Sequence, residues 1–136
     1  MCRFQPGVPM EIALNIESKR KTATVVAFRD GQRSFGDEAL GIGVKFPNLC
    51  YSYFLDLLGK KMDHPAVTSF QERFPHYTLE SDPVRGTVVF RHNETTTYSP
   101  EELLGMLISH AQFIAERYHQ AFSTPLLCSS VHYLSF

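Results

Sequence analysis

Over residues 8–35, apolar and polar residues follow one another in short runs, which is the pattern of β-strands. The segments 8–14 and 22–28 are the clearest, and the second is rich in β-branched residues. Asp30-Gly31 is typical of a tight turn, because glycine accepts a positive φ angle without steric cost. With Gln32 to Phe35 returning after the turn, we predict a β-hairpin.

After residue 36 the apolar spacing changes to that of helices. Asp37 is expected to cap a helix that continues to about Lys45, because Pro47 cannot continue the helical hydrogen bonds. Gly41-Ile42-Gly43 falls inside it and lacks the third glycine of a dinucleotide-binding loop. We therefore interpret these glycines as positions of close packing or of a loop.

Two further helices are expected before residue 75. In the first, Asn48 is the cap, apolar residues recur at helical spacing to Leu58, and Gly59 marks the end. In the second, Asp63 is the cap of a short helix over residues 65–73. From residue 77 to residue 98, short β-branched and aromatic runs with intervening turns predict a β-meander.

The clearest element is a helix from Ser99 to about Phe122. Ser99 and Glu102 form a capping box around Pro100 at the first helical position, which satisfies free amides and suits the helix dipole. One broad face is apolar and the opposite face is polar. The apolar face contains Leu103, Leu104, Leu107, Ile108, Ala111, Ile114, Ala115, Tyr118 and Phe122.

Composition and charge describe one ordinary globular domain of 136 residues, with 43% hydrophobic and 20% charged residues. Thirteen basic against fourteen acidic residues give a net charge of −1, which argues against binding to nucleic acid or membrane through bulk charge. No apolar stretch is long enough to span a bilayer. The first residues show no secretory signal, so the chain is expected in the cytosol if expressed as written.

The residues able to carry chemistry form no active-site pattern. Cys2, Cys50 and Cys128 contain no CxxC pair, and the six histidines lack metal-ligand spacing, so no metal site is expected. Core packing is the favoured interpretation of Cys50, and His110 is expected to be a partly buried structural histidine. Residues 19–21 are interpreted as the solvated start of a strand. Glu101, Glu102 and Asp63 are each explained by helix capping.

Two segments stand apart from this picture. Asn93-Glu94-Thr95 is an acceptor pattern for N-glycosylation in a predicted surface turn, which matters if the chain enters the secretory route. Residues 123–136 carry no Lys, Arg, Asp or Glu and are rich in bulky apolar residues. Such a tail is either a strand that needs a neighbour or a segment prone to aggregation.

Several ordered runs nevertheless make the chain resemble the amino-terminal ATPase domain of the 70-kDa heat-shock chaperone superfamily. The first and last of these runs are closest to the large endoplasmic-reticulum members. The runs are PGVPMEI at 6–12, Asn15 with SKRKT at 18–22, FGDEA at 35–39, LLGKK at 57–61, DHPAV at 63–67 and YSPEELLGM at 98–106.

This resemblance implies an α/β fold: part of lobe I, chiefly its outer subdomain, of an actin-like ATPase domain. Short mixed or antiparallel strands and a long C-terminal amphipathic helix would build it. Residues 6–122 would form the partial nucleotide-binding domain, and residues 1–5 and 123–136 diverge from the family. The family's phosphate loops and catalytic carboxylates match no residues here. Its catalytic lysine aligns with Leu55, which cannot place a cation on a phosphate.

The leading hypothesis is therefore a fragment of an ATP-dependent chaperone for protein folding and stress response in the endoplasmic-reticulum lumen. No catalytic, cofactor-binding or metal-binding residue is assigned to the chain itself; ATP and magnesium belong to the full-length family. Partners would be other chaperones of that compartment and unfolded polypeptides, with no nucleic acid and no membrane. The alternatives are a non-enzymatic interaction module, or competitor of the full-length chaperone, and a fragment that does not fold stably.

Overall fold

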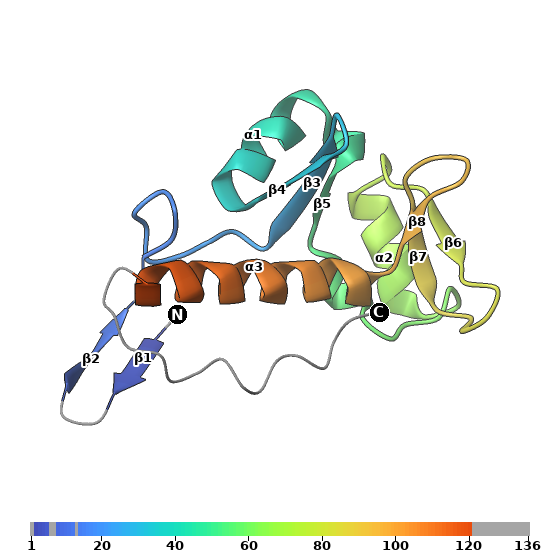
Figure 1. Ribbon diagram of the computed structural model, residues 1–136. Coiled ribbons are helices and arrows are strands. Elements are labelled where there is room, and N and C mark those ends of the chain that lie inside the picture. Colours follow the sequence, from blue (N-terminus) through green and yellow to red (C-terminus); the bar gives the residue numbers. More distant parts are fainter. Residues whose placement is uncertain (1, 6–7, 13, 121–136) are drawn as a thin grey trace. The chain divides into compact units, whose positions relative to one another are not determined.

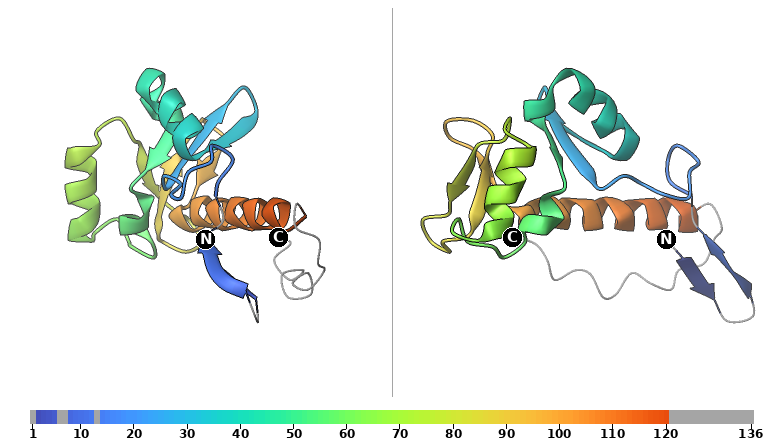
Figure 2. Two further views of the ribbon diagram at one scale, coloured as in Figure 1. Left: turned by 90° about the vertical axis from the view of Figure 1, so that its left-hand side faces the viewer. Right: turned by 180° about the vertical axis from the view of Figure 1, so that it is seen from behind.

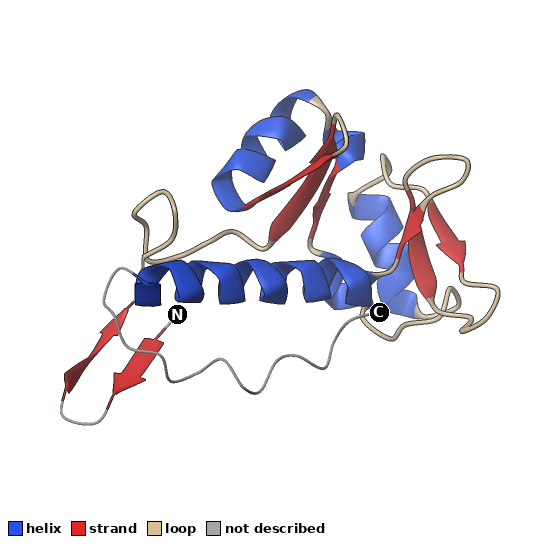
Figure 3. Cartoon of the chain, viewed as in Figure 1, coloured by secondary structure: helices blue, strands red, loops and turns tan. Residues whose placement is uncertain are grey.

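A computed structural model describes residues 2–5, 8–12 and 14–120 of the chain (Figures 1 and 3). These residues form two compact units: Lys21–His110 is one, and the described parts of Met1–Arg20 and Ala111–Phe136 belong to the other. All pairings between the described strands are antiparallel. The tail of residues 123–136, expected to be either a strand that needs a neighbour or an aggregation-prone segment, lies outside the described residues.

The first sheet of the larger unit has the strand order β4-β3-β5. Its strands are β3 (Val25–Arg29), β4 (Gln32–Phe35) and β5 (Cys50–Ser52). Asp30 and Gly31 both have positive φ angles, 51° and 75°, so the predicted hairpin is confirmed at the predicted turn. Three successive residues of β3, Val25 to Ala27, are buried, since this central strand is covered on both faces.

Helix α1 (Gly36–Lys45) covers one face of this sheet, as Figure 1 shows. It ends before Pro47 as predicted, but the prediction of Asp37 as its cap is wrong. The residue before the helix is Phe35, with no side-chain cap, and Asp37 lies inside the first turn. The negative charge of the Asp37 carboxylate there suits the positive end of the helix dipole.

The predicted helix over residues 48–58 is wrong. The segment forms a short 3-10 turn η1 (Pro47–Leu49), strand β5 and a second 3-10 turn η2 (Phe54–Leu57). Tyr53 separates strand from turn with a left-handed φ angle of 58°, which an α-helix cannot contain. Pairing of residues 50–52 with β3 replaces the local helical hydrogen bonds, and Gly59 follows the 3-10 turn with a positive φ angle of 64°.

The remaining elements of the larger unit begin with helix α2 (Pro65–Arg73). The meander follows as strands β6 (Leu79–Ser81), β7 (Val88–Arg91) and β8 (Thr97–Tyr98), in that order across the sheet. The cap of α2 is His64 instead of Asp63, because the Nδ1 atom of His64 accepts a hydrogen bond from the Ala66 amide at 3.1 Å. The meander and the short helix are otherwise confirmed.

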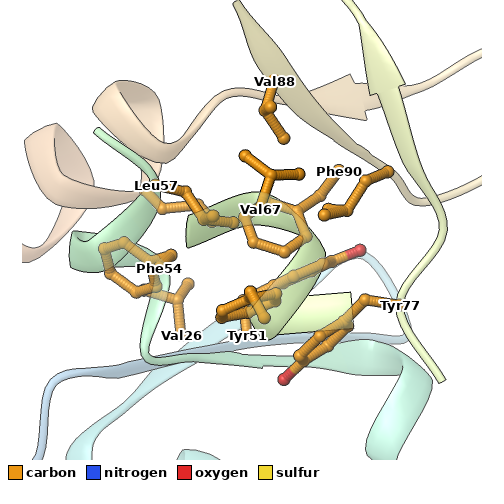
Figure 4. Close-up of a cluster of buried hydrophobic side chains, with 11 residues drawn as sticks. Val26, Tyr51, Phe54, Leu57, Val67, Tyr77, Val88 and Phe90 are labelled. Carbon is orange, nitrogen blue, oxygen red and sulfur yellow. The ribbon is translucent and has the colours of Figure 1, made fainter. Parts of the chain in front are cut away.

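One hydrophobic cluster joins these elements (Figure 4). Buried side chains from β3, β5, η2, α2 and β7 converge in it, and aromatic rings make up much of its volume. The residues labelled in the figure are Val26, Tyr51, Phe54, Leu57, Val67, Tyr77, Val88 and Phe90. A smaller cluster of Val25, Ala27, Ala39 and Cys50 lies on the other face of β3, since successive side chains of a strand alternate.

Helix α3 (Pro100–Gln120) starts with the predicted capping box. The Ser99 hydroxyl accepts from the Glu102 amide at 3.1 Å, and the Glu102 carboxylate accepts from the Ser99 amide at 2.8 Å. Leu103 is fully buried, whereas Ile108, which the sequence placed on the same apolar face, is 61% exposed. Ile108 lies at the edge of the apolar face of α3, next to the solvent-exposed face of the helix.

Replacing Ser99 with alanine is expected to lower the free energy of unfolding by about 1 kcal/mol, because one amide of the first turn loses its acceptor. The matched control is Ser109→Ala, the same change at an exposed position inside α3. That variant is expected to leave stability unchanged or to raise it slightly, because alanine has the higher helix propensity. Urea unfolding followed by circular dichroism measures both, and an equal effect of the two variants would contradict the cap.

The smaller unit contains a hairpin of strands β1 (Cys2–Gln5) and β2 (Val8–Ile12), visible in the right-hand view of Figure 2. A turn follows in which the Asn15 Oδ1 atom accepts from the Lys19 amide at 2.7 Å. The sequence predicted β2 within residues 8–14 but no strand at residues 2–5. Strand β1 needs its partner's hydrogen bonds to form, and local propensity does not report those.

Candidate functional site

Leu55, which the family resemblance predicts at the position of the catalytic lysine, is on the surface of the larger unit. In the 3-10 turn η2, Phe54 and Leu57 are three residues apart and both point into the core, where each is buried. Leu55 lies between them and is 43% exposed. The turn thus directs Leu55 outward, where a functional side chain would reach a ligand.

Leu55 lines an apolar hollow of about 420 Å³, which we call the Leu55 hollow. It lies between the start of β3, helix α1 and the turn η2. Its lining residues are Ala23, Thr24, Val25, Leu40, Ser52, Tyr53, Leu55 and Asp56. None of these described residues is Lys, Arg or His, and the single charged group is the acidic Asp56. The hollow therefore offers no cation to a phosphate group.

Two lysines follow Leu55 closely, and neither lines the Leu55 hollow. Lys60 accepts a backbone hydrogen bond from the Val88 amide at 2.9 Å, and Lys61 forms an isolated β-bridge with Thr87. The backbone of this pair is thus tied to strand β7. This placement gives no reason to transfer the role of the catalytic lysine to either residue.

Glu101 has a different role from the predicted one of helix cap. One carboxylate oxygen accepts a hydrogen bond from the Gly59 amide at 2.7 Å, which joins the start of α3 to the turn after η2. The other oxygen is buried and has no hydrogen-bond partner among the described residues. The prediction failed because the partner amide is 42 residues away in the sequence.

A second hollow, of about 750 Å³, opens at the hairpin of β3 and β4. The rings of Phe28 and Tyr98 stack in its wall at 4.3 Å and 2°. The Arg29 guanidinium lies 5.0 Å from the Phe46 ring centroid and pairs with Asp30 at 3.2 Å. We call this the hairpin hollow; its wall combines aromatic rings with cations.

Buried tyrosine hydroxyl groups of the larger unit form hydrogen bonds between segments that are distant in the sequence. The Tyr77 hydroxyl donates to the Cys50 carbonyl at 2.6 Å, and the Tyr51 hydroxyl lies 2.9 Å from His92 Nδ1. Burial raises the pKa of both tyrosines and of the Cys50 thiol. The Cys50 thiol is thus a poor nucleophile, and core packing is confirmed, on a strand instead of the predicted helix.

Among the described residues, histidines pack against neighbouring side chains and form no metal site. His110 stacks on Phe35 at 4.4 Å, which confirms its packing role. Within the part of the chain that the structure describes, no group of three His, Cys, Asp or Glu side chains is placed to hold a metal ion. No helix of the described ranges is long and apolar enough to cross a bilayer.

Comparison with known proteins identifies the family. A family model described as Hsp70 protein matches residues 6–124. The chain belongs to the Hsp70 family.

Similar Hsp70 proteins carry the name hypoxia up-regulated protein 1. The chain is 52% identical to the protein of Xenopus tropicalis over 114 residues, which are 84% of the chain and 18% of that relative. Identity to the Gallus gallus protein is 49%, over 84% of the chain and 11% of the relative. Identity to the Homo sapiens protein is 46%, over 82% of the chain and 11% of the relative. The chain thus spans less than a fifth of each of these relatives.

The architecture agrees with this Hsp70 membership. Antiparallel sheets, short helices and a long C-terminal helix form the mixed α/β fold expected for part of the Hsp70 actin-like ATPase domain. The runs that carried the family resemblance fall on identifiable elements: residues 35–39 start α1, and residues 98–106 start α3. The two hollows were not predicted, because each is lined by segments that are distant in the sequence.

Proposed function

We propose that this chain is part of lobe I, chiefly the outer subdomain, of the ATPase domain of an Hsp70-type chaperone of the endoplasmic-reticulum lumen. Residues 6–122 would form this partial domain, with divergent ends at 1–5 and 123–136. The Hsp70 family match and the 46–52% identity to proteins named hypoxia up-regulated protein 1 support the proposed chaperone family. The full-length protein would bind magnesium and ATP and act on unfolded polypeptides with other chaperones of that compartment.

We further propose that the 136-residue chain by itself neither binds nor hydrolyses ATP. The observation in the structure that supports this proposal is the Leu55 hollow, which has no cationic lining residue where the resemblance places the family's catalytic lysine; the missing second lobe is a separate ground. An actin-like ATPase also holds its nucleotide between two lobes, so that groups from both stabilise the transferring phosphate. Less than a fifth of a relative's length supplies one wall of such a cleft.

Titration of magnesium-ATP into the purified chain is expected to release no saturable heat in calorimetry. The control variant Leu55→Lys restores a cation at the family's position, and we expect it to remain equally silent, since one charge does not replace a second lobe. A cooperative thermal melt of both proteins ensures that silence does not reflect unfolding. Micromolar binding by the unaltered chain would refute the proposal, and binding by Leu55→Lys alone would locate the deficit in Leu55.

The alternative of a non-enzymatic interaction module stays a prediction. Its docking surface would be the outer face of the long helix or the uncharged tail. On α3, Ile108 is an exposed apolar side chain, while residues 123–136 lie outside the described residues. Pull-down from lysate with the full chain and with a version lacking residues 123–136 separates this alternative, since equal and empty recovery contradicts it.

A further inference from the structure

The turn between strands β7 and β8 carries a sequence pattern that the ATPase fold does not explain. Asn93, Glu94 and Thr95 follow the pattern Asn-x-Ser/Thr, with a middle residue other than proline. All three residues are exposed. The other two asparagines, Asn15 and Asn48, are followed two positions later by Glu17 and Cys50 and do not match. The acceptor pattern is thus confined to this turn.

The backbone holds this turn in place without help from the acceptor side chains. The His92 and Asn93 amides both donate to the Thr96 carbonyl, at 2.9 Å and 3.1 Å. Strands β7 and β8 continue the ladder beyond it, with Arg91 opposite Thr97. A group attached to the side-chain nitrogen of Asn93, Nδ2, therefore removes none of the backbone hydrogen bonds that close the turn.

The surroundings of Asn93 leave space for a bulky substituent. Asn93 lines the hairpin hollow, which is open and has a volume of about 750 Å³. The stacked rings of Phe28 and Tyr98 and the exposed Arg33 line the same hollow. Aromatic faces and guanidinium donors suit the apolar faces and hydroxyl groups of sugars. A sugar on Asn93 meets open space and compatible side chains instead of packed core.

We propose that Asn93 is an N-glycosylation site whose first sugars lie at the hairpin hollow. The inference rests on the proposed lumenal location, because the donor, a lipid diphosphate-linked oligosaccharide, is presented there. In the transfer, the side-chain nitrogen Nδ2 of Asn93 bonds to C1 of the first sugar, and the bond from C1 to the diphosphate oxygen breaks. The nitrogen loses a proton to a base of the transferase, and the lipid diphosphate leaves.

The test is translation of the complete chain, preceded by a cleavable secretory signal, in the presence of endoplasmic-reticulum microsomes. We expect a single shift to higher apparent mass that endoglycosidase H removes. The shift is expected to disappear in Asn93→Gln and in Thr95→Ala, and to persist in the matched control Asn48→Gln, which alters another exposed asparagine. Absence of the shift in the unaltered chain, or its persistence in Asn93→Gln, would overturn the proposal.

The added signal separates this proposal from the proposed location. It brings the chain into the lumen whatever its own targeting, so a missing shift counts against Asn93 alone. A second measurement tests the placement at the hairpin hollow: the glycosylated chain and the Asn93→Gln variant, which carries no sugar, are expected to melt at the same temperature. A lower melting temperature of the glycosylated form would show that the sugar disturbs the turn, and would overturn the placement.

Discussion

Replacing Phe90 with alanine is expected to lower the free energy of unfolding by about 3–5 kcal/mol, as for other buried phenylalanines. Phe90 is 0% exposed, and its ring centroid lies 5.2 Å from that of Tyr51 and 5.4 Å from that of Tyr77, both in edge-on contact. Removal of the ring leaves a cavity between the meander and strand β5. Because small domains are stable by only about 5–15 kcal/mol, this single change removes much of the total.

Urea unfolding at 25 °C, followed by circular dichroism, measures this effect. The control is Val84→Ala, because Val84 is 90% exposed in a turn of the same meander and its truncation is expected to change stability by less than about 0.5 kcal/mol. Similar effects of the two variants would mean that the hydrophobic cluster does not form in solution. The same result would favour the hypothesis that the isolated chain does not fold stably.

Two glycines of helix α1 are expected to respond with opposite sign to the same substitution. A Cβ atom on Gly43 would lie 2.7 Å from the Cys50 sulfur and 3.1 Å from its Cβ, whereas one on Gly41 meets nothing within 4 Å. Gly43→Ala is therefore expected to destabilise by about 1–2 kcal/mol, because the buried Cys50 side chain must shift. Gly41→Ala is expected to stabilise by about 0.5–1 kcal/mol through helix propensity alone.

Thermal and urea unfolding of both variants check this pair. A double variant, Gly43→Ala with Cys50→Ala, tests the cause, since removal of the sulfur is expected to relieve most of the clash. The cost of Gly43→Ala should thus be smaller in the Cys50→Ala background than in the unaltered chain. If both glycine variants stabilise the protein, the close approach of α1 to β5 is wrong.

Prediction from the sequence worked best where the decisive interaction is local. The capping box of Ser99 and Glu102 spans three residues, and the turn at Asp30-Gly31 spans two, so the sequence pattern contains all of their chemistry. It failed over residues 48–58, where local spacing favours a helix and pairing with β3 imposes a strand. Glu101 is a similar case, because its partner Gly59 is distant in the sequence.

For the candidate site, too, the sequence predicted local motifs but not the contacts between distant segments. The alignment of family runs placed Leu55 at the lysine position, and the pattern Asn-x-Thr marked Asn93, because a motif needs only the order of residues. Whether either side chain reaches solvent depends on neighbours that the sequence pattern does not specify. The turn η2 exposes Leu55 by burying Phe54 and Leu57, and the backbone bonds of the β7–β8 turn expose Asn93.

The sequence alone determined the family resemblance, the long capped helix, the main hairpin and the meander, because short-range patterns and residue order encode them. The tertiary structure alone decided that Cys50 to Ser52 form a strand, that Glu101 binds the turn at Gly59 and that two hollows open on the larger unit. The physical reason is that hydrogen bonding and burial between distant segments outweigh the small local preferences of each segment.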